Sequence, residues 1–210
     1  MVNFEASIII PTHPDDLIYA HEKASKIVAL GNYEIVIDSS IGLAHSTFLA
    51  ISKAQCERVV ITDCDRLHPV SYIPTILAML DEYDLVKCSR ATATWNLQGL
   101  FSNAGNVLAE VMLGCGIGDY TTKFYGGYRS KLLQLDCWHG HFDYIMELLY
   151  SAKMLNWSIY DMPFIPDLGG DNGKESHTRI LRDSRDYMRR MIQVRRTHGK
   201  QEAKETVKQS

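Results

Sequence analysis

Two aspartates separated by one residue, Asp63 and Asp65, are the side chains whose type and spacing point most directly to chemistry. The β-branched run at residues 58–62 predicts a buried strand before them, and Pro69 suits the first turn of a following helix. In extended backbone the side chains at i and i+2 point the same way, so both carboxylates would converge at the strand's C-terminal end. Open α/β sheets bind ligands at that end. The pair therefore predicts a Mg²⁺ or Mn²⁺ site completed by water and substrate phosphates, with two solvated turn aspartates as the alternative.

The first half of the chain alternates between predicted strands and helices. Apolar runs predict strands at 6–10, 33–38, 58–62 and 84–89, and helical periodicity predicts helices at 15–30, 43–54 and 70–80. This alternation indicates a βαβ layout with a largely parallel sheet. Four further polar or special residues then lie at strand ends beside the aspartate pair: Pro11, Thr12, Asp38 and Arg90.

The second half is less regular. A helix is predicted at 97–113, a strand at 120–128 that could be antiparallel, a helix at 142–155 and a strand at 157–162. Residues 166–173 are a loop by composition and could form a mobile flap. Residues 178–196 predict a helix with seven arginines, which is either a solvated face or a surface for an anionic membrane. We expect one domain over 1–197, with a regular half to about 90, a less regular half at about 91–176 and this basic helix, followed by a polar tail at 198–210.

Composition narrows the class of protein. The 210 residues are 46% hydrophobic and 22% charged, as in an ordinary soluble globular protein. A formal charge of -3 argues against nucleic acid as a partner. The five cysteines are widely spaced and form no C-x-x-C, which suits reduced thiols. The chain shows neither a basic signal-peptide start nor an apolar run of membrane-spanning length, so we expect a cytoplasmic protein, with peripheral membrane contact as an option.

Six segments occur in an order and spacing that resemble the GT-A-fold, family 2 glycosyltransferases, especially the dolichol- and polyprenol-phosphate sugar transferases. They cover most of residues 6–165 and read SIIIPT (7–12), EIVID (34–38), VVITDCDRLHPVSYIPTIL (59–77), DLVKCSR (84–90), GDYTTKFYGGYRSKLL (118–133) and MELLYSAKMLNWSIYDMPF (146–164). The resemblance implies a single GT-A-like (Rossmann-like) domain with a mostly parallel central sheet flanked by helices. It also implies metal-dependent, inverting transfer of a sugar from a UDP- or GDP-sugar, with a donor-binding half to about residue 90 and an acceptor half at about 91–176. The acceptor would be a hydroxyl of a glycan or protein, or a lipid phosphate.

The resemblance also assigns roles to residues. Pro11, Thr12 and Asp38 would line the donor pocket, although a turn-capping aspartate is an equal reading of Asp38. Asp63 and Asp65 would hold the metal, with Asp65 the more direct ligand. Arg90 would pair its planar fork with the diphosphate or an acceptor phosphate, unless it forms a surface salt bridge.

The general base that a hydroxyl acceptor needs would be Asp143. It opens a predicted helix, with Glu147 one turn later, and a dipole-favoured acid at a helix start is the alternative. Asp119 is a second candidate near the acceptor pocket.

Departures from the family pattern leave other classes open. Leu67 stands where these transferases often have a metal-binding Gln, Lys123 replaces a glycine, and a helix and strand expected after Asp38 are nearly absent. The run His13-Pro14-Asp15-Asp16 also resembles zinc-dependent sugar N-deacetylases. A non-catalytic nucleotide-sugar binding protein on a trimmed scaffold is a third hypothesis.

Overall fold

The computed structural model describes residues 3–40, 42–64, 67–91, 97–138, 144–167, 189 and 192–195. The strands are β1 Ala6–Pro11, β2 Tyr33–Asp38, β3 Arg58–Ile61, β4 Leu85–Arg90, β5 Tyr125–Tyr128 and β6 Ile159–Phe164. The α-helices are α1 Leu17–Val28, α2 Leu43–Lys53, α3 Ile73–Met79, α4 Leu97–Leu113, α5 Arg129–Leu132 and α6 Tyr144–Met154. Single 3-10 turns, η1 Pro14–Asp16 and η2 Val70–Tyr72, lead into α1 and α3.

The strands form one six-stranded sheet in the order β2-β1-β3-β5-β4-β6. β5 runs antiparallel to both of its neighbours, and the other pairs are parallel. The predicted α/β class with a mostly parallel sheet is confirmed. The strand expected from residue 120 begins only at Tyr125. The reason is local, because the Asp119 carboxylate accepts hydrogen bonds from the backbone N–H groups of Thr121 and Thr122 and folds them into a turn.

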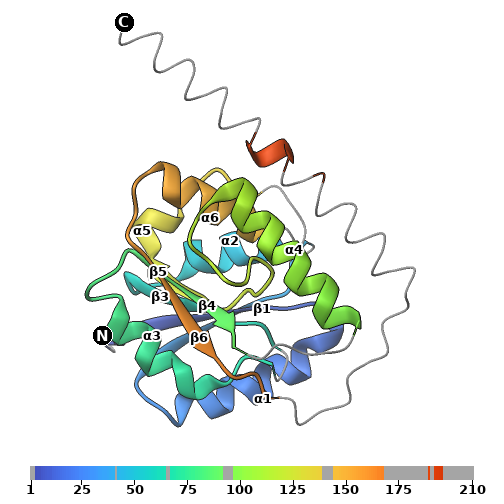
Figure 1. Cartoon of the computed structure of the whole chain (residues 1–210). Coiled ribbons are helices and arrows are strands. Elements are labelled where there is room, and N and C mark those ends of the chain that lie inside the picture. Colours follow the sequence, from blue (N-terminus) through green and yellow to red (C-terminus); the bar gives the residue numbers. More distant parts are fainter. Residues whose placement is uncertain are drawn as a thin grey trace, which may run out of the picture.

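Helices cover both faces of the sheet (Figure 1), with α1 and α3 on one face and α2, α4 and α6 on the other. Successive strand side chains alternate between these faces. Thus Ile8 and Ile10 of β1 pack toward α1 and α3, while Ile9 packs into the opposite core. Both cores are closed, so the sheet is buried on each side, as its continuous apolar strands predict.

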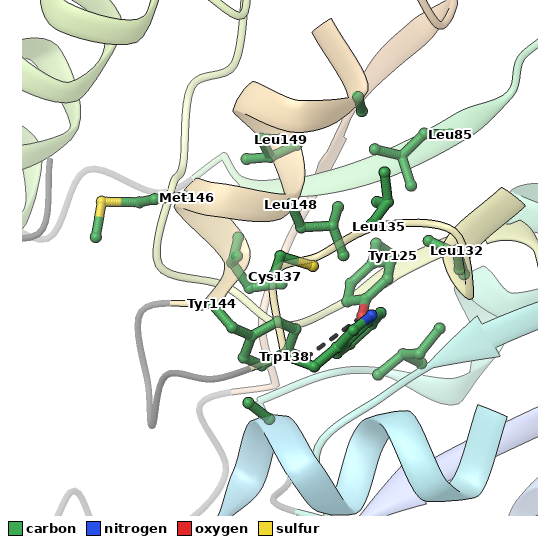
Figure 2. Packing of buried hydrophobic residues seen from close by; sticks show 14 of the residues in the cluster. Leu85, Tyr125, Leu132, Leu135, Cys137, Trp138, Tyr144, Met146, Leu148 and Leu149 are labelled. Carbon is green, nitrogen blue, oxygen red and sulfur yellow. Dashed lines mark hydrogen bonds between the residues drawn. The ribbon is translucent and has the colours of Figure 1, made fainter. Parts of the chain in front are cut away.

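The core under α2 and α6 is the more aromatic of the two. Figure 2 shows Tyr125, Trp138 and Tyr144 packed together beneath the leucines of α6. The Trp138 and Tyr144 rings lie 5.5 Å apart, and the hydroxyls of Tyr125 and Tyr144 are within 3.4 Å. This cluster fixes the start of α6 against β5 in the middle of the sheet.

A glycine in β5, Gly126, allows α3 to pack closely against the sheet face that it shares with α1. A Cβ added to Gly126 would lie 2.4 Å from Cγ2 of Ile76, closer than real atoms come. The sequence YGGY of this strand therefore reflects close packing rather than flexibility.

The topology brings the C-terminal ends of five strands to one edge. β1, β2, β3, β4 and β6 all finish there, and antiparallel β5 starts there. The loop before β5 joins this edge through the hydrogen bond from Cys88 N to Phe124 O, 2.9 Å. Every site residue predicted from the donor half that the structure describes lies at this edge.

Candidate active site

The ends of β1 and β2 place Pro11, Thr12 and Asp38 side by side. Pro11 pairs with Asp38 in the sheet, and Thr12 N donates to Asp38 O at 2.9 Å. The Asp38 carboxylate is buried and accepts hydrogen bonds from Ser40 N at 2.9 Å and Lys53 Nζ at 2.7 Å. Burial would raise the pKa of Asp38, but these hydrogen bonds outweigh it and lower the pKa to about 2. Asp38 thus caps the turn after β2 and pairs with Lys53, and a nucleoside contact there would share this carboxylate with both groups.

Asp63 lies two residues after the end of β3 and is half-buried. Its Oδ1 accepts a hydrogen bond from Cys64 N at 3.0 Å. Its N–H donates to His68 Nδ1 at 3.0 Å, and its carbonyl accepts from Lys23 Nζ at 2.6 Å. Asp65, the other half of the predicted pair, lies outside the described residues.

A metal site at Asp63 is judged from the donors that the structure describes. Within that part of the chain, no three His, Cys, Asp or Glu side chains form a group that could hold a metal ion by itself. Mg²⁺ and Mn²⁺ do not need one, because carboxylate oxygens suit both and one or two carboxylates with water and phosphate oxygens suffice for Mg²⁺. Asp63, with a hard oxygen donor at the ligand-binding edge, fits that chemistry.

His68 sits in the loop after Asp63 with four cations within electrostatic reach. The imidazole is 6% exposed and stacks on Phe124 with ring centroids 5.0 Å apart. Burial lowers the pKa of His68 well below its usual value, and surrounding positive charges lower it further, so the ring is neutral. Those charges belong to Lys23, Lys87, Lys123 and Arg90. Their convergence makes this edge attractive to anions.

Arg90, at the end of β4, is fixed by a buried carboxylate. Its Nε donates to Asp119 Oδ2 at 2.6 Å, and its Nη2 donates to Asp119 Oδ1 at 3.3 Å and to Thr121 Oγ1 at 2.7 Å. The Arg90 side chain is 36% exposed and that of Asp119 is 3% exposed, so the pair is no ordinary surface salt bridge. It presents one guanidinium at the edge of the sheet in a set orientation.

Asp119 is too heavily hydrogen-bonded to act as a base. Besides Arg90, its Oδ1 accepts from Thr121 N, Thr121 Oγ1 and Thr122 N, and its Oδ2 accepts from Thr122 Oγ1. Burial would raise the pKa of Asp119, but the charges of Lys87 and Arg90 and these hydrogen bonds hold it well below its usual range. Of the two acidic candidates for the acceptor half, Asp119 therefore serves to orient Arg90.

Sequence reasoning missed a buried lysine behind this pair. Lys87 lies in the middle of β4, is fully buried, and donates from Nζ to Cys88 O at 2.7 Å. Its neighbour in register on β6 is Asp161, which accepts from Gly118 N at 2.8 Å and from Ser89 Oγ. Burial lowers the pKa of Lys87, and Asp119 and Asp161 oppose that shift. A lysine inside an otherwise apolar strand was the visible indication, since such a residue needs buried counter-charges.

Several predicted features fall outside the described residues. They are Asp65, the proposed base Asp143, the greater part of the loop at 166–173, and most of the basic segment at 178–196. Within that segment, residues 192–195 are helical and Val194 is buried. No helix of the described part is long and apolar enough to cross a membrane.

The His-Pro-Asp-Asp run begins a helix. The His13 ring accepts a hydrogen bond from Asp15 N at 3.3 Å and caps η1. The side chains of His13 and Asp15 are 68% and 88% exposed. Nothing in this geometry adds support to the zinc deacetylase hypothesis.

The fold is that of the GT-A glycosyltransferases. Glucosyl-3-phosphoglycerate synthase from Mycobacterium tuberculosis, solved with Mn²⁺, UDP-glucose and phosphoglyceric acid, superposes with a TM-score of 0.68. The match has 15% identity and covers 90% of this chain and 79% of that one. The same synthase with Mn²⁺, UDP and glucosyl-3-phosphoglycerate gives a TM-score of 0.67 at 16% identity, with the same coverage. At such identity the likeness establishes the fold.

A curated protein is similar to this chain in sequence over about half of its length. A dolichyl-phosphate hexose transferase from Haloferax volcanii is 33% identical over 110 residues, which are 50% of this chain and 48% of the relative. The chain thus matches about half the length of this curated relative. No family model matches the chain. The predicted resemblance to GT-A-fold transferases of the dolichol-phosphate type is confirmed, and both relatives are named for the transfer or synthesis of glycosides.

Proposed function

We propose that this protein is a glycosyltransferase that moves a sugar from a nucleoside-diphosphate sugar to a phosphate-bearing acceptor. The observation that carries the proposal is the single edge of the GT-A sheet at which the Asp63 carboxylate and the Arg90 guanidinium both lie. One group suits a divalent cation and the other suits a phosphate. A nucleotide-sugar transferase needs both at its reacting centre.

On the donor side, Pro11, Thr12 and Asp38 would meet the nucleoside, and Asp63 with Asp65 would hold Mn²⁺ or Mg²⁺. A bound divalent ion neutralises charge on the departing diphosphate as a Lewis acid. The synthase of similar fold is described with Mn²⁺ and UDP-glucose, which supports this donor class and this metal. Ser40 uses one oxygen of the buried Asp38 carboxylate and Lys53 uses the other, and each oxygen has a second lone pair that could accept from a nucleoside donor group.

On the acceptor side, Arg90 would bind the phosphate. Its Nε and Nη2 are held by Asp119 and Thr121, so its orientation is set before the ligand arrives. Lys123 adds a positive charge near the same place, and the names of both relatives involve phosphorylated compounds, a dolichyl phosphate and a phosphoglycerate. A preset guanidinium favours a phosphate over a neutral sugar, because the phosphate carries the opposite charge and hydrogen bonds between charged groups are the stronger ones.

Two kinds of attacking group remain within this proposal. A lipid phosphate is itself an anionic nucleophile, whereas a hydroxyl on a phosphorylated molecule must lose a proton to a base. Asp143, directly before the first residue of α6, is our proposed base for the second case. The basic segment at 178–196 would contact an anionic membrane in the first case.

Binding of donors tests the proposal first. UDP-glucose and GDP-mannose, each with and without Mn²⁺, should be titrated while the unfolding temperature is followed. A donor at a hundred times its Kd stabilises the native state by about 2.7 kcal/mol. We expect one donor to raise the unfolding temperature, more so with Mn²⁺. If neither donor binds with or without Mn²⁺, the proposed function is wrong.

Transfer then identifies the acceptor. The accepted donor should be incubated with a polyprenyl phosphate in detergent, with 3-phosphoglycerate, and with neutral monosaccharides. We expect a glycosylated product from a phosphorylated compound, and Arg90→Ala should abolish most of its formation while donor binding persists. Product from the neutral sugars alone would refute a phosphate-bearing acceptor. Binding to phosphatidylglycerol vesicles, but not to phosphatidylcholine vesicles, would separate a lipid acceptor from a soluble one.

A further inference from the structure

The two backbone polar groups of Asp63 are held by two buried side chains from different parts of the chain. Its N–H donates to Nδ1 of His68 at 3.0 Å, and its carbonyl accepts from Nζ of Lys23 at 2.6 Å. Lys23 and His68 are each 6% exposed. Two buried polar side chains thus each form a hydrogen bond with the backbone of Asp63.

The end of β3 explains why these partners are needed. Thr62 N donates to Ile9 O at 3.0 Å, and β3 itself ends at Ile61, so Asp63 lies just beyond the sheet. Its N–H and carbonyl therefore have no strand partner, although buried backbone groups require one. The side chains of His68 and Lys23 provide these hydrogen bonds in place of a neighbouring strand. As a result, the position of the Asp63 backbone depends on Lys23 and His68.

Packing holds the His68 ring where it can accept this hydrogen bond. The ring stacks on Phe124 with an interplanar angle of 9° and meets the edge of Phe164 with centroids 6.0 Å apart. Because Nδ1 accepts the Asp63 N–H, the ring's proton sits on Nε2. Phe124 leads into β5, so the ring connects the turn at Asp63 to the centre of the sheet.

Lys23 extends from α1 to the backbone of the same residue, Asp63. Its buried position on the helix carries a desolvation penalty that an exposed lysine avoids, as the next lysine on α1 illustrates. That residue, Lys26, is 58% exposed and pairs with Glu22 on its own helix. The ammonium of Lys23 is instead placed against Asp63 O, beside the carboxylate that this peptide carries.

We infer that Lys23 and His68 are positioning residues that fix the backbone of Asp63 so that its carboxylate is preset for a divalent cation. The inference rests on the proposed function to the extent that Asp63 binds the cation. With its backbone fixed and Oδ1 receiving Cys64 N at 3.0 Å, the carboxylate has little freedom to turn. Groups that orient a metal ligand in this way typically affect metal affinity by about 10- to 100-fold.

Paired substitutions separate this role from general packing. His68→Phe keeps a ring to stack on Phe124 but removes the acceptor, whereas His68→Asn keeps an acceptor oxygen. Lys23→Met keeps most of the aliphatic stem but removes the donor. Lys26→Met is the matched control on the exposed face of the same helix.

Two measurements are needed on each variant. The first is amide hydrogen exchange at Asp63 in the free protein, followed by NMR. The second is the affinity for Mn²⁺ in the presence of UDP, followed by electron paramagnetic resonance, together with the affinity for UDP without metal. We expect faster exchange in His68→Phe and Lys23→Met, and Mn²⁺ affinity lower by roughly tenfold or more. His68→Asn should recover much of both, Lys26→Met should match the wild type, and UDP affinity without metal should hardly change.

Each outcome decides a distinct point. Wild-type exchange and wild-type Mn²⁺ affinity in both His68→Phe and Lys23→Met would overturn the positioning role. Equal losses in His68→Phe and His68→Asn, with UDP affinity falling alongside, would overturn it in favour of a packing role. If the wild type itself fails to bind Mn²⁺ with UDP, the proposed function and the cation step of this inference are both wrong. The exchange data would then still decide whether the two side chains fix the peptide.

Discussion

Arg90 and Asp119 form an ion pair in which the aspartate is buried and the arginine reaches the edge of the sheet, with Nε 2.6 Å from Oδ2. Thr121 contributes to both partners, because its hydroxyl accepts from Arg90 Nη2 and donates to Asp119 Oδ1. The guanidinium therefore has a defined direction before any ligand binds. We expect this pair to control affinity for the phosphate-bearing acceptor.

Asp119→Asn should weaken both acceptor binding and the fold. The amide keeps the shape of the carboxylate but not its charge, so Arg90 loses its ion pair beside buried Lys87. Breaking a buried pair costs about 3–5 kcal/mol, and partial exposure of Arg90 reduces this to about 2 kcal/mol of unfolding free energy. Urea unfolding and acceptor titration would measure the two effects. Arg90→Lys is the companion variant and should keep the fold but lose acceptor affinity, because an ammonium lacks the fork. Unchanged acceptor affinity in both variants would contradict the assignment.

The stability of the protein should fall in acid between about pH 4 and pH 2. Asp38 has its pKa lowered to about 2 in the folded protein, from an ordinary value of 3.8, and the pKa of Asp119 is lowered further. A carboxyl with a depressed folded pKa contributes stability above its unfolded pKa and loses it as pH falls through the folded value. Below about pH 4 the unfolded chain binds protons first, so unfolding becomes easier.

Thermal unfolding between pH 6 and pH 2 would check this dependence. Asp38→Asn should lower the unfolding temperature at pH 6 and flatten the acid decline, because one of the responsible groups is gone. Asp81→Asn, at a side chain that is 71% exposed, is the matched control and should keep the wild-type curve shape. An acid decline as steep in Asp38→Asn as in the wild type would show that Asp38 does not contribute to it.

Much of the fold could be predicted because it is encoded locally. The strand at Tyr33–Asp38 and the helix at Leu97–Leu113 have the predicted bounds, since an apolar run and a helical period need no distant partner. The other three strands of the first half end within one residue of their predicted C-terminal ends, which is why Asp38 and Arg90 lie at the predicted edge. The late start of β5 was missed although its cause is also local, because Asp119 accepts from the backbone N–H groups two and three residues later and forms a turn there.

The hydrogen-bond partners of the site residues could not be predicted from the sequence. Lys23 meets the peptide of Asp63 across 40 positions, and Arg90 meets Asp119 across 29. Such contacts depend on the register of the sheet and on where helices pack, which no local pattern fixes. The sequence could place charged residues at an edge, but it could not tell which charge would be neutralised by its neighbours.

Gly126→Ala should destabilise the protein through a single contact. The new Cβ would meet Cγ2 of Ile76 at 2.4 Å, so α3 would have to move or distort. Overpacking of this kind costs about 1–3 kcal/mol. Chemical denaturation would measure it. Ile76→Leu removes the β-branched methyl at nearly constant volume, so the double variant should be more stable than Gly126→Ala alone. Additive losses would mean that the clash is not the cause.

Mn²⁺ should strengthen binding of the nucleoside-diphosphate sugar, and Asp65→Asn should remove most of that gain. Carboxylate oxygens are the donors that such an ion prefers, and the change is nearly isosteric, so the fold should remain intact. Asp63→Asn should also weaken the metal effect. Isothermal titration of the donor with and without Mn²⁺ gives the comparison, and Asp81→Asn again serves as the exposed control. Equal titrations of wild type and Asp65→Asn with metal present would refute the metal-site assignment.

Asp143→Asn decides which group on the acceptor attacks the sugar. A hydroxyl must lose its proton as the new bond forms, and a positioned base contributes roughly a hundred- to ten-thousand-fold to such a step. A lipid phosphate already carries its negative charge and needs no base. With a hydroxyl acceptor we expect Asp143→Asn to lower transfer by about a hundredfold or more while donor affinity stays at the wild-type value. Single-turnover transfer with each acceptor, alongside donor titration, would measure both quantities. Glu147→Gln, on the first turn of α6, is the neighbouring control and should leave transfer within a few-fold. Turnover near that of the wild type in Asp143→Asn, with the acceptor that the wild type uses best, would remove Asp143 as the base and favour a phosphate oxygen as the nucleophile.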